Sequence, residues 1–474
     1  MTPISASLAV GGDTMLDGSA LENLKDSLRG DLLLEGDLGY DDARSIWNAM
    51  IDRKPALIVR CRGAADVCTA VKFAAMHNLL TSIHGAGHNI AGNAVCDHGL
   101  MIDLSEMSEV RVDTTTRRAH VEPGATLGDA DHETQAFGLA IPTGINSTTG
   151  IAGLTLGGGF GWLSRKYGMT VDALRAADVV TADGNLVHAS EIEHPDLFWA
   201  IRGGGGNFGV VTRFEFEIFP VGPEVLAGLV VFSHNEAKTV LKNYRKYVAG
   251  LGDETSVWAV LRQAPPLPFL PESVHGTNVL VMAICHIGDH KEGEEILKPI
   301  RSFGKVLGEH VGVQSFKGWQ RAFDPLLTPG ARNYWKSHNF LQMEDNLIDI
   351  VADYAGKLPS AECEIFFAAL GGAVNRVPSD ATAYSHRDAN FVLNVHGRWE
   401  NAADDRKCIG WARDFFKASE PYATGGVYIN FMTADETERV GAAFGSSYDR
   451  LAEVKAKYDP DNLFRMNQNI PPKA

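Results

Sequence analysis

The sequence has few cysteines, no long apolar run and no surplus of basic residues. Its six cysteines are scattered and form no Cys-x-x-Cys pair, which disfavours a zinc site and a disulfide scaffold. The sequence contains no run of about eighteen apolar residues, which a membrane-spanning helix would need. The first residues have neither the basic nor the apolar segment of a secretion signal, so we expect a cytoplasmic protein.

The balance of charges limits the expected partners. The 474 residues carry a formal net charge of −16. Nucleic acids and anionic membrane surfaces attract basic proteins, so neither is an expected partner. The chain is long enough for two or three domains, and its 49 glycines indicate many tight loops.

One glycine-rich stretch, HGAGHNIAG at residues 84–92, has the composition of a phosphate-binding loop. Glycine has no Cβ, so the backbone amides of such a loop can approach a phosphate closely. The stretch lies between two strand patterns, at 79–83 and 99–104. A Rossmann turn leads from a strand into a helix, so that dinucleotide-binding fold is not expected here.

The histidine in the middle of this stretch is His88. His84 and His88 have the i,i+4 spacing of a helical zinc site, but the glycines between them disfavour a helix. We therefore expect no metal site. An ordinary loop histidine without a special role stays open at this point.

A second glycine-rich region covers residues 142–168 and carries almost no charge. Such a stretch lets another backbone or a flat ligand lie against it. Within it, Asn146-Ser147-Thr148 is a formal glycosylation sequence, which we interpret as a polar turn.

A third glycine cluster contains Gly204, Gly206 and Gly209 in the pattern GxGxxG. A helix beginning at His194 precedes this pattern and a strand at 209–219 follows it. This order is the reverse of the Rossmann order, so we interpret the match as accidental.

Hydrophobic periodicity predicts an α+β fold. In the first half it predicts strands at 55–60, 79–83, 99–104, 110–112, 118–121, 179–182 and 209–219, with helices at 21–28, 64–78, 127–137 and from 194. From Leu226 on it predicts strands at 226–232, 256–263, 277–286, 333–340, 362–370, 390–396 and 425–431, separated by helices at 236–251, 292–303 and 345–358. A helix is also expected in the tail from residue 442. This order favours an antiparallel sheet with helices on one face.

Four segments together resemble the flavin-dependent oxidases of the vanillyl-alcohol oxidase and berberine bridge enzyme superfamily. They are HGAGHNIAG, TGIAGLTLGGGFGWLSRKYG, HPDLFWAIRGGGGNFGVVTRFEF and YDPDNLFRMNQNI, in the family's order. The resemblance spans most of the chain. It implies a two-lobed FAD-binding domain of the PCMH type at 1–222, a substrate-binding domain at 223–424 and a C-terminal segment, 425–474, that returns to the FAD-binding domain.

The resemblance also implies a covalent cofactor. In the family, the histidine at the place of His88 is bonded to the 8α-methyl group of FAD, and a neutral imidazole is nucleophilic enough for this role. Many members have a second link through a cysteine near the place of Asn146. No cysteine lies nearby here, so we expect a single link. Further FAD contacts are expected from Gly85, Ala86, Gly87, Asn89, Gly92, Asn146, Gly150, Gly153, Gly158, Asn207, Gly209, Val211, Tyr428 and Asn430.

Oxidation by a flavin removes a hydride from a substrate carbon and, for an alcohol, also requires a group that takes a proton. Alternation along the predicted strand 362–370 puts Glu362, Glu364 and Phe366 on one face. A carboxylate among apolar neighbours is costly unless it is used or paired, so Glu364 is our candidate base. An ion pair at the end of a strand is the alternative.

Two other pairs are candidates for the site. His396 shares a strand face with Asn394, and Tyr428 shares one with Asn430 if residues 425–431 form a strand. The segment with Tyr428 resembles the family's segment that reaches the flavin from the C-terminal side. Structural hydrogen bonds are the alternative role for these side chains.

A third set, Tyr334, Lys336 and His338, also shares one face of a predicted strand. These side chains either point into the site or extend along the protein surface toward solvent.

The resemblance implies an FAD-dependent oxidase that takes a hydride from a small alcohol or amine and is reoxidised by O2 to give H2O2. A sugar or oligosaccharide oxidase is an alternative, and so is a dehydrogenase with an acceptor other than oxygen. A flavin-binding protein without turnover is the third possibility.

Overall fold

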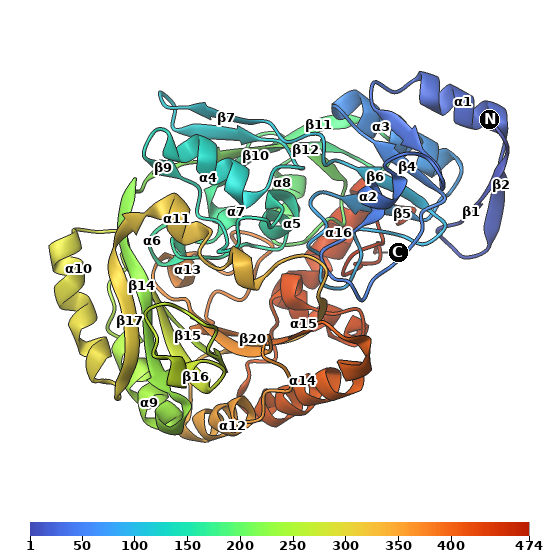
Figure 1. Ribbon diagram of the computed structural model, residues 1–474. Coiled ribbons are helices and arrows are strands. Elements are labelled where there is room, and N and C mark those ends of the chain that lie inside the picture. The colour runs from blue at the N-terminus through green and yellow to red at the C-terminus, as the bar shows by residue number, and fades with distance from the viewer. Residues whose placement is uncertain (474) are drawn as a thin grey trace.

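The computed structural model describes residues 1–473 and has three layers of sheet structure (Figure 1). Ala474, the last residue of the predicted C-terminal segment, lies outside the described residues. The α+β prediction is confirmed, because helices are combined with two large antiparallel sheets and a four-stranded mixed sheet. Among the described residues, no helix is both long and apolar enough to cross a bilayer.

The first lobe is a small sheet with the strand order β3-β4-β6-β5. Strands β4, β6 and β5 run parallel, and helix α3 lays its buried face of small and branched residues against them. Its elements are β1 (Ile4–Ser7), β2 (Asp13–Leu16), α1 (Gly18–Asp26), β3 (Asp31–Leu33), α2 (Tyr40–Arg44), β4 (Leu57–Arg60), α3 (Ala64–Met76), β5 (Thr81–His84) and β6 (Leu100–Asp103). The stretch 84–92 therefore follows directly on β5 and points out of this sheet.

The second lobe is an antiparallel sheet with the order β11-β10-β12-β8-β7. Helix α4 begins with a capping box in which Thr126 and Asp129 satisfy each other's backbone amides. The elements are β7 (Val110–Asp113), β8 (Arg118–Val121), α4 (Leu127–Gln135), β9 (Leu139–Ala140), α5 (Ile151–Leu156), α6 (Ser164–Tyr167), α7 (Thr170–Ala173), β10 (Leu174–Val180), β11 (Leu186–Ser190), α8 (Pro195–Ile201), β12 (Val210–Glu217) and β13 (Phe219–Pro220).

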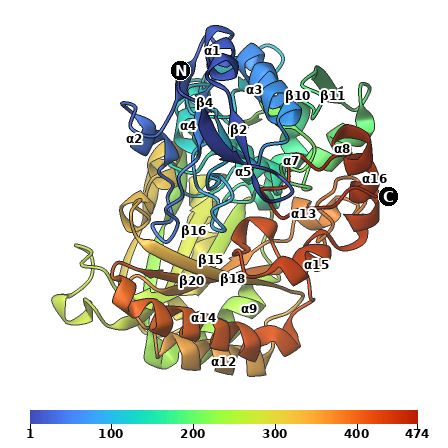
Figure 2. The same ribbon diagram turned by 90° about the vertical axis from the view of Figure 1, so that its right-hand side faces the viewer.

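The third layer is a seven-stranded antiparallel sheet with the order β17-β14-β16-β15-β19-β20-β18. Helices α9, α12 and α14 cover one face, and the two lobes lie over the other (Figures 1 and 2). The elements are β14 (Glu224–Ser233), α9 (Ala237–Val248), β15 (Thr255–Gln263), β16 (Asn278–His286), α10 (His290–Leu297), β17 (Val306–Ser315), α11 (Phe316–Gln320), β18 (Arg332–Phe340), α12 (Asp345–Ala355), β19 (Glu364–Ala369), α13 (Ala373–Arg376), β20 (Phe391–Trp399) and α14 (Asp405–Ser419).

The C-terminal tail returns to the second lobe through α15 (Val440–Phe444) and α16 (Tyr448–Tyr458). Lys455 on α16 is fully buried and donates to the backbone oxygens of Asn207 and Phe464, at 2.7 and 3.0 Å, and to the carboxylate of Asp459 at 2.6 Å. Asn207 in turn accepts from the amide of Ile470 and donates to the backbone oxygen of Gln468. These contacts bind the tail to the third glycine cluster.

The predicted strand at 425–431 is wrong. This segment is extended and ends in a 3-10 turn at Ile429–Phe431, and it pairs with no strand among the described residues. The side chains of Tyr428 and Asn430 instead hydrogen-bond to Gly159 and Leu154 of the second lobe, so the alternation reflects burial between segments and not a strand of a sheet.

Several elements were not predicted from the sequence, among them the short strands β3 and β11 and the short helices α2 and α5. Strand β17 contains Gly308 and Gly312, which weaken a strand pattern. Helix α14 and the hairpin of β1 and β2 were also missed, although α14 buries Cys408, Trp411 and Phe415 on one face.

Candidate active site

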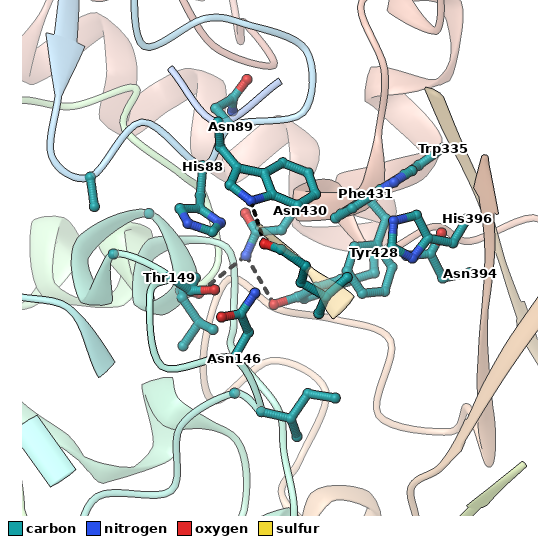
Figure 3. Close-up of a pocket in the computed structure, with 18 of the residues that line it drawn as sticks. His88, Asn89, Asn146, Thr149, Trp335, Asn394, His396, Tyr428, Asn430 and Phe431 are labelled. Atoms are coloured by element: carbon teal, nitrogen blue, oxygen red, sulfur yellow. Dashed lines mark hydrogen bonds between the residues drawn. The ribbon is translucent and has the colours of Figure 1, made fainter. Parts of the chain in front are cut away.

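A large cavity of about 390 Å³ lies between the two lobes, the seven-stranded sheet and the C-terminal tail. Its walls combine backbone-rich loops from the lobes with side chains from the sheet (Figure 3). The lobes contribute all three glycine-rich regions, the sheet contributes β14, β15, β16, β18, β19 and β20, and the tail contributes residues 428–431 and 464–468.

The loop after β5 lines one wall of this cavity. Its base is held by a buried relay in which Arg60 Nε lies 3.0 Å from Asp103 and the other oxygen of Asp103 lies 3.2 Å from His84 Nδ1. Gly87 has a φ of +68°, and a Cβ there would lie 2.9 Å from the His84 ring, so the backbone needs glycine. His84 therefore supports the loop from below and lies outside the cavity lining.

His88 lies in the cavity wall and is held on two sides. Its ring stacks on Trp47, with centroids 5.3 Å apart, and its Nε2 lies 3.2 Å from the hydroxyl of Thr148. That hydroxyl donates its single proton to Asn146 Oδ1 at 2.9 Å, so it must accept a hydrogen bond from His88 Nε2. Burial lowers the pKa of His88 to about 4, so the imidazole is neutral at physiological pH.

The second glycine-rich region packs directly on this loop. A Cβ at Gly150 would lie 2.8 Å from the Cβ of Ala86, so the two loops touch only because glycine stands there. Added Cβ atoms at Gly153 and Gly206 would meet no protein atom within 4 Å, and both residues line the cavity. The cavity is therefore open at these positions to a ligand that lies against backbone.

A contact from the seven-stranded sheet's side fixes the turn that contains Asn146. Asp324 accepts from the backbone amide of Ser147 at 3.0 Å and from its hydroxyl at 2.5 Å. Asn146 and Thr148 flank Ser147, so Asp324 indirectly holds the side chains around His88.

Tyr428 and Asn430 enter the cavity from the tail. The Tyr428 hydroxyl accepts from the Gly159 amide at 3.1 Å. It also accepts from Asn430 Nδ2 at 2.9 Å (Figure 3), and Asn430 donates to the Leu154 carbonyl at 3.2 Å. Burial raises the pKa of Tyr428 to about 12, so the phenol stays protonated. Both side chains thus line the cavity, and they also make the structural hydrogen bonds expected as their alternative role.

The opposite wall carries a row of cross-strand neighbours on the sheet. Trp335, His396, Glu364 and Arg262 face one another in register on β18, β20, β19 and β15. Glu364 Oε1 lies 3.2 Å from His396 Nδ1, and Glu364 Oε2 lies 2.9 Å from Arg262 Nη1. Burial would raise the pKa of Glu364, but the charge of Arg262 and the bond to His396 outweigh it, and the net pKa is lowered.

Several polar atoms on this wall have no partner among residues 1–473. They are His396 Nε2, Trp335 Nε1 and Asn394 Oδ1, all buried. Buried polar groups are nearly always hydrogen-bonded in native proteins, to protein or to ordered water, so these three atoms are available to bind a polar group or water in the cavity. Figure 3 shows His396 and Asn394 on the side of the cavity away from His88.

Most of the residues predicted for the site line this cavity. They are Gly85, Ala86, Gly87, His88, Asn89, Asn146, Gly150, Gly153, Gly209, Val211, Glu364, His396, Tyr428 and Asn430. Three predicted cofactor contacts lie outside the lining. Gly92 packs against Ile51, Gly158 packs against Tyr384, and Asn207 holds the tail.

The set Tyr334, Lys336 and His338 does share one face of β18, but that face points away from the cavity. Lys336 is buried and pairs with Asp435 at 2.9 Å, and His338 stacks on Phe416. These side chains neither point into the site nor extend along the surface toward solvent. They connect the sheet to α14 and to the tail.

Sequence reasoning missed Arg262, Trp335 and Asp324. Arg262 and Trp335 lie on strands that were predicted, so alternation could have placed them on a face, but only the strand pairing shows that they adjoin Glu364 and His396. Asp324 lies in a short 3-10 turn that carries no pattern of its own.

Two family models match the chain. The FAD binding domain matches residues 55–190, and the model described as berberine and berberine like matches residues 427–471. These spans contain the loops and the tail that line the cavity.

Individual proteins are similar over nearly the whole chain. The (R)-6-hydroxynicotine oxidase of Paenarthrobacter nicotinovorans is 30% identical over 94% of this chain and 98% of its own. The solved structure of 6-hydroxy-D-nicotine oxidase from Arthrobacter nicotinovorans has a TM-score of 0.85 at 28% identity and covers 94% of this chain and 99% of its own.

A solved glucooligosaccharide oxidase from Acremonium strictum has a TM-score of 0.85 at 25% identity, covers 96% of this chain and 99% of its own, and is described with a 6-S-cysteinyl, 8α-N1-histidyl FAD. Its fold and the two family models agree with the resemblance seen in the sequence. The chain therefore belongs to the vanillyl-alcohol oxidase and berberine bridge enzyme superfamily and is an FAD-dependent oxidoreductase.

Proposed function

We propose that this protein is an oxidase that removes a hydride from a carbon of a small alcohol or amine and passes the electrons to O2, giving H2O2. The observation that carries the proposal is the buried, unpartnered Nε2 of His396 on the cavity wall. FAD, when bound, supplies the acceptor for the hydride.

His396 has the geometry of a general base. Glu364 is ionised and can only accept hydrogen bonds, so the Nδ1 of a neutral His396 carries the proton. The lone pair of Nε2 then faces the cavity, where it can take the proton of a substrate hydroxyl or ammonium group. Glu364 orients the imidazole and stabilises the positive charge that this transfer creates.

This assignment changes the role first expected for Glu364. Glu364 is the first residue of β19 and forms an ion pair with Arg262, which agrees with the alternative of an ion pair at the end of a strand. Its lowered pKa makes the carboxylate a weak proton acceptor, so we assign the base role to His396 and a positioning role to Glu364.

We also propose that His88 is the single covalent attachment point of FAD. Three observations support this: the ring is neutral, its Nε2 proton is bound to Thr148, and Nδ1 is left as the nucleophilic nitrogen. Asn146 stands where a second, cysteine link would be needed. A flavin that stays on the denatured chain and maps to a peptide with His88 supports the proposal, whereas attachment elsewhere or a freely released flavin contradicts it.

An anaerobic screen tests the reaction. Alcohols, amines and oligosaccharides are added to the yellow holoenzyme, and bleaching of the flavin identifies the substrate class before any acceptor is present. Air is then admitted, and peroxide is measured. Bleaching without peroxide would point to a dehydrogenase, and no bleaching by any alcohol, amine or sugar would contradict the proposal.

Oligosaccharide oxidation is the second candidate, and the similarity to glucooligosaccharide oxidase favours it. The composition of the cavity wall favours the first candidate. Beyond the row that begins at Trp335, the sheet presents mainly aliphatic and aromatic side chains, which offer a sugar few hydrogen-bond partners.

A further inference from the structure

The cavity extends beyond the row with His396 into a compartment that we call the aliphatic arm. Six of the side chains that line it are Leu229, Val231, Val260, Leu267, Leu270 and Val281. They come from β14, β15, β16 and the connection between β15 and β16. We propose that this arm binds the apolar tail of an elongated substrate, whose oxidisable carbon lies near His396. The inference deepens the proposed function and rests on it.

Strand register places the arm in line with the reacting end. Asn394, Phe366, Val260, Val281 and Val231 are successive cross-strand neighbours on β20, β19, β15, β16 and β14. Adjacent strands lie about 4.8 Å apart, so the arm reaches about 14 Å from β19 to β14. A single elongated molecule can therefore contact His396 with a polar head group, while its apolar tail lies along the row that begins at Asn394.

The row that begins at Trp335 changes from polar to apolar along its length. It contains the polar residues His396, Glu364 and Arg262, and the next residue in register is the apolar Val279. Beyond Arg262 the cavity-facing side chains in the arm contain only carbon. A saccharide would lose the hydrogen bonds of its hydroxyls there without replacement, whereas an alkyl or aryl group would not.

The arm also has accessible apolar surface. Leu229, Val260 and Leu267 are only partly buried although they belong to an apolar cluster. An apolar cavity wall gives water few partners, so filling it with an apolar group is favourable.

The roof of the arm is built to keep its shape. It is the segment 264–271, which contains Pro265, Pro266, Pro268 and Pro271. Proline restricts the backbone in the unfolded and the free state, so a proline-rich roof loses little entropy when a ligand binds. Leu267 and Leu270 project from this segment into the arm.

The test uses a series of probes that cannot be oxidised, 4-n-alkylbenzamides from methyl to hexyl. Binding to the holoenzyme is measured by titration calorimetry, so no turnover is needed. We expect the Kd to fall about fourfold for each added methylene until the arm is filled. The heat capacity change of binding should become more negative along the series.

Variants locate the effect. Val281→Phe should fill the arm and bring the Kd of the methyl probe and the Kd of the hexyl probe close together. Leu267→Ala alters the roof of the arm and should also change the ratio of these two Kd values. Val313→Phe places the same side chain on the exposed edge strand β17, where Val313 is 49% exposed, and should leave the ratio and the basal activity unchanged. Thermal unfolding of each variant identifies any that fail to fold.

Two outcomes overturn the inference: a Kd that does not depend on chain length, or a xylo- or cello-oligosaccharide that binds more tightly than the hexyl probe. The matching 4-n-alkylbenzyl alcohols and amines separate this inference from the proposed function. If the probes show the chain-length dependence but no alcohol or amine bleaches the flavin, the aliphatic arm stands and the proposed reaction fails.

Discussion

Replacing Glu364 with glutamine keeps the size of the side chain and removes its charge. The substitution weakens the 3.2 Å contact to His396 Nδ1 and leaves the Arg262 guanidinium, 2.9 Å away, without a counter-ion. A hydrogen bond to a charged group contributes about 1.5–3 kcal/mol. If that contribution is made mainly when His396 takes up a proton, flavin reduction should slow about 10- to 150-fold.

Anaerobic stopped-flow measurement of flavin bleaching gives this rate directly. Because the pKa of Glu364 is lowered, the wild-type carboxylate is ionised from mildly acidic to alkaline pH, so the loss should be similar at pH 6 and pH 8. FAD content should not change, since Glu364 belongs to the sheet and not to the loops around His88.

Glu362→Gln is the matched control. Glu362 lies two residues earlier, outside the cavity lining, and pairs with Arg398 at 3.1 Å. Its loss should change the rate of flavin reduction less than threefold. If Glu364→Gln reduced its flavin as fast as the wild-type enzyme, or if it lost its FAD, the positioning role of Glu364 would be refuted.

Three further substitutions test other parts of the structure. Asp131→Asn should raise the melting temperature at pH 8 but hardly at pH 4. Burial raises the pKa of Asp131 to about 7, so the wild-type protein loses stability as the pH rises from 4 to 8 and the buried carboxyl group must ionise. Asp324→Asn weakens the clamp on Ser147 and should slow covalent attachment of FAD about 2- to 10-fold, measured as acid-stable flavin over time. Lys455→Met leaves the buried Asp459 carboxylate unpaired and should lower the free energy of unfolding by about 3–5 kcal/mol, measured in a denaturant titration.

The cofactor side of the cavity could be predicted largely from the sequence. The loop at 84–92, the glycines at 142–168 and those at 203–209 are local patterns, and each reaches the cavity as a continuous piece of chain. The glycines of these patterns allow close approach between segments, as at Gly150 against Ala86, but the contact itself becomes visible only in the structure. The resemblance then added the order of the segments and the return of the tail.

The substrate side could not be predicted in the same way. Arg262, Trp335 and His396 are far apart in the sequence, and they adjoin only because β15, β19, β20 and β18 pair in one register. Alternation shows which residues share a face, but not whether that face meets the cavity or the helices. Tyr334 and its neighbours on β18 show the difference, since they share a face that points to α14.

The seven-stranded sheet separates stability from chemistry by its period of two residues. On β19, Ile365 and Phe367 pack into the core under α9, α12 and α14, while Glu364 and Phe366 face the cavity. Substitutions on the cavity face can therefore change the substrate without opening the main core. The loops around His88 have no such freedom, because their backbones touch each other and the cofactor would lie against them. If the proposed function and the aliphatic arm are correct, the identity of the substrate is encoded in the two rows that begin at Trp335 and Asn394 and in the side chains of the arm next to them.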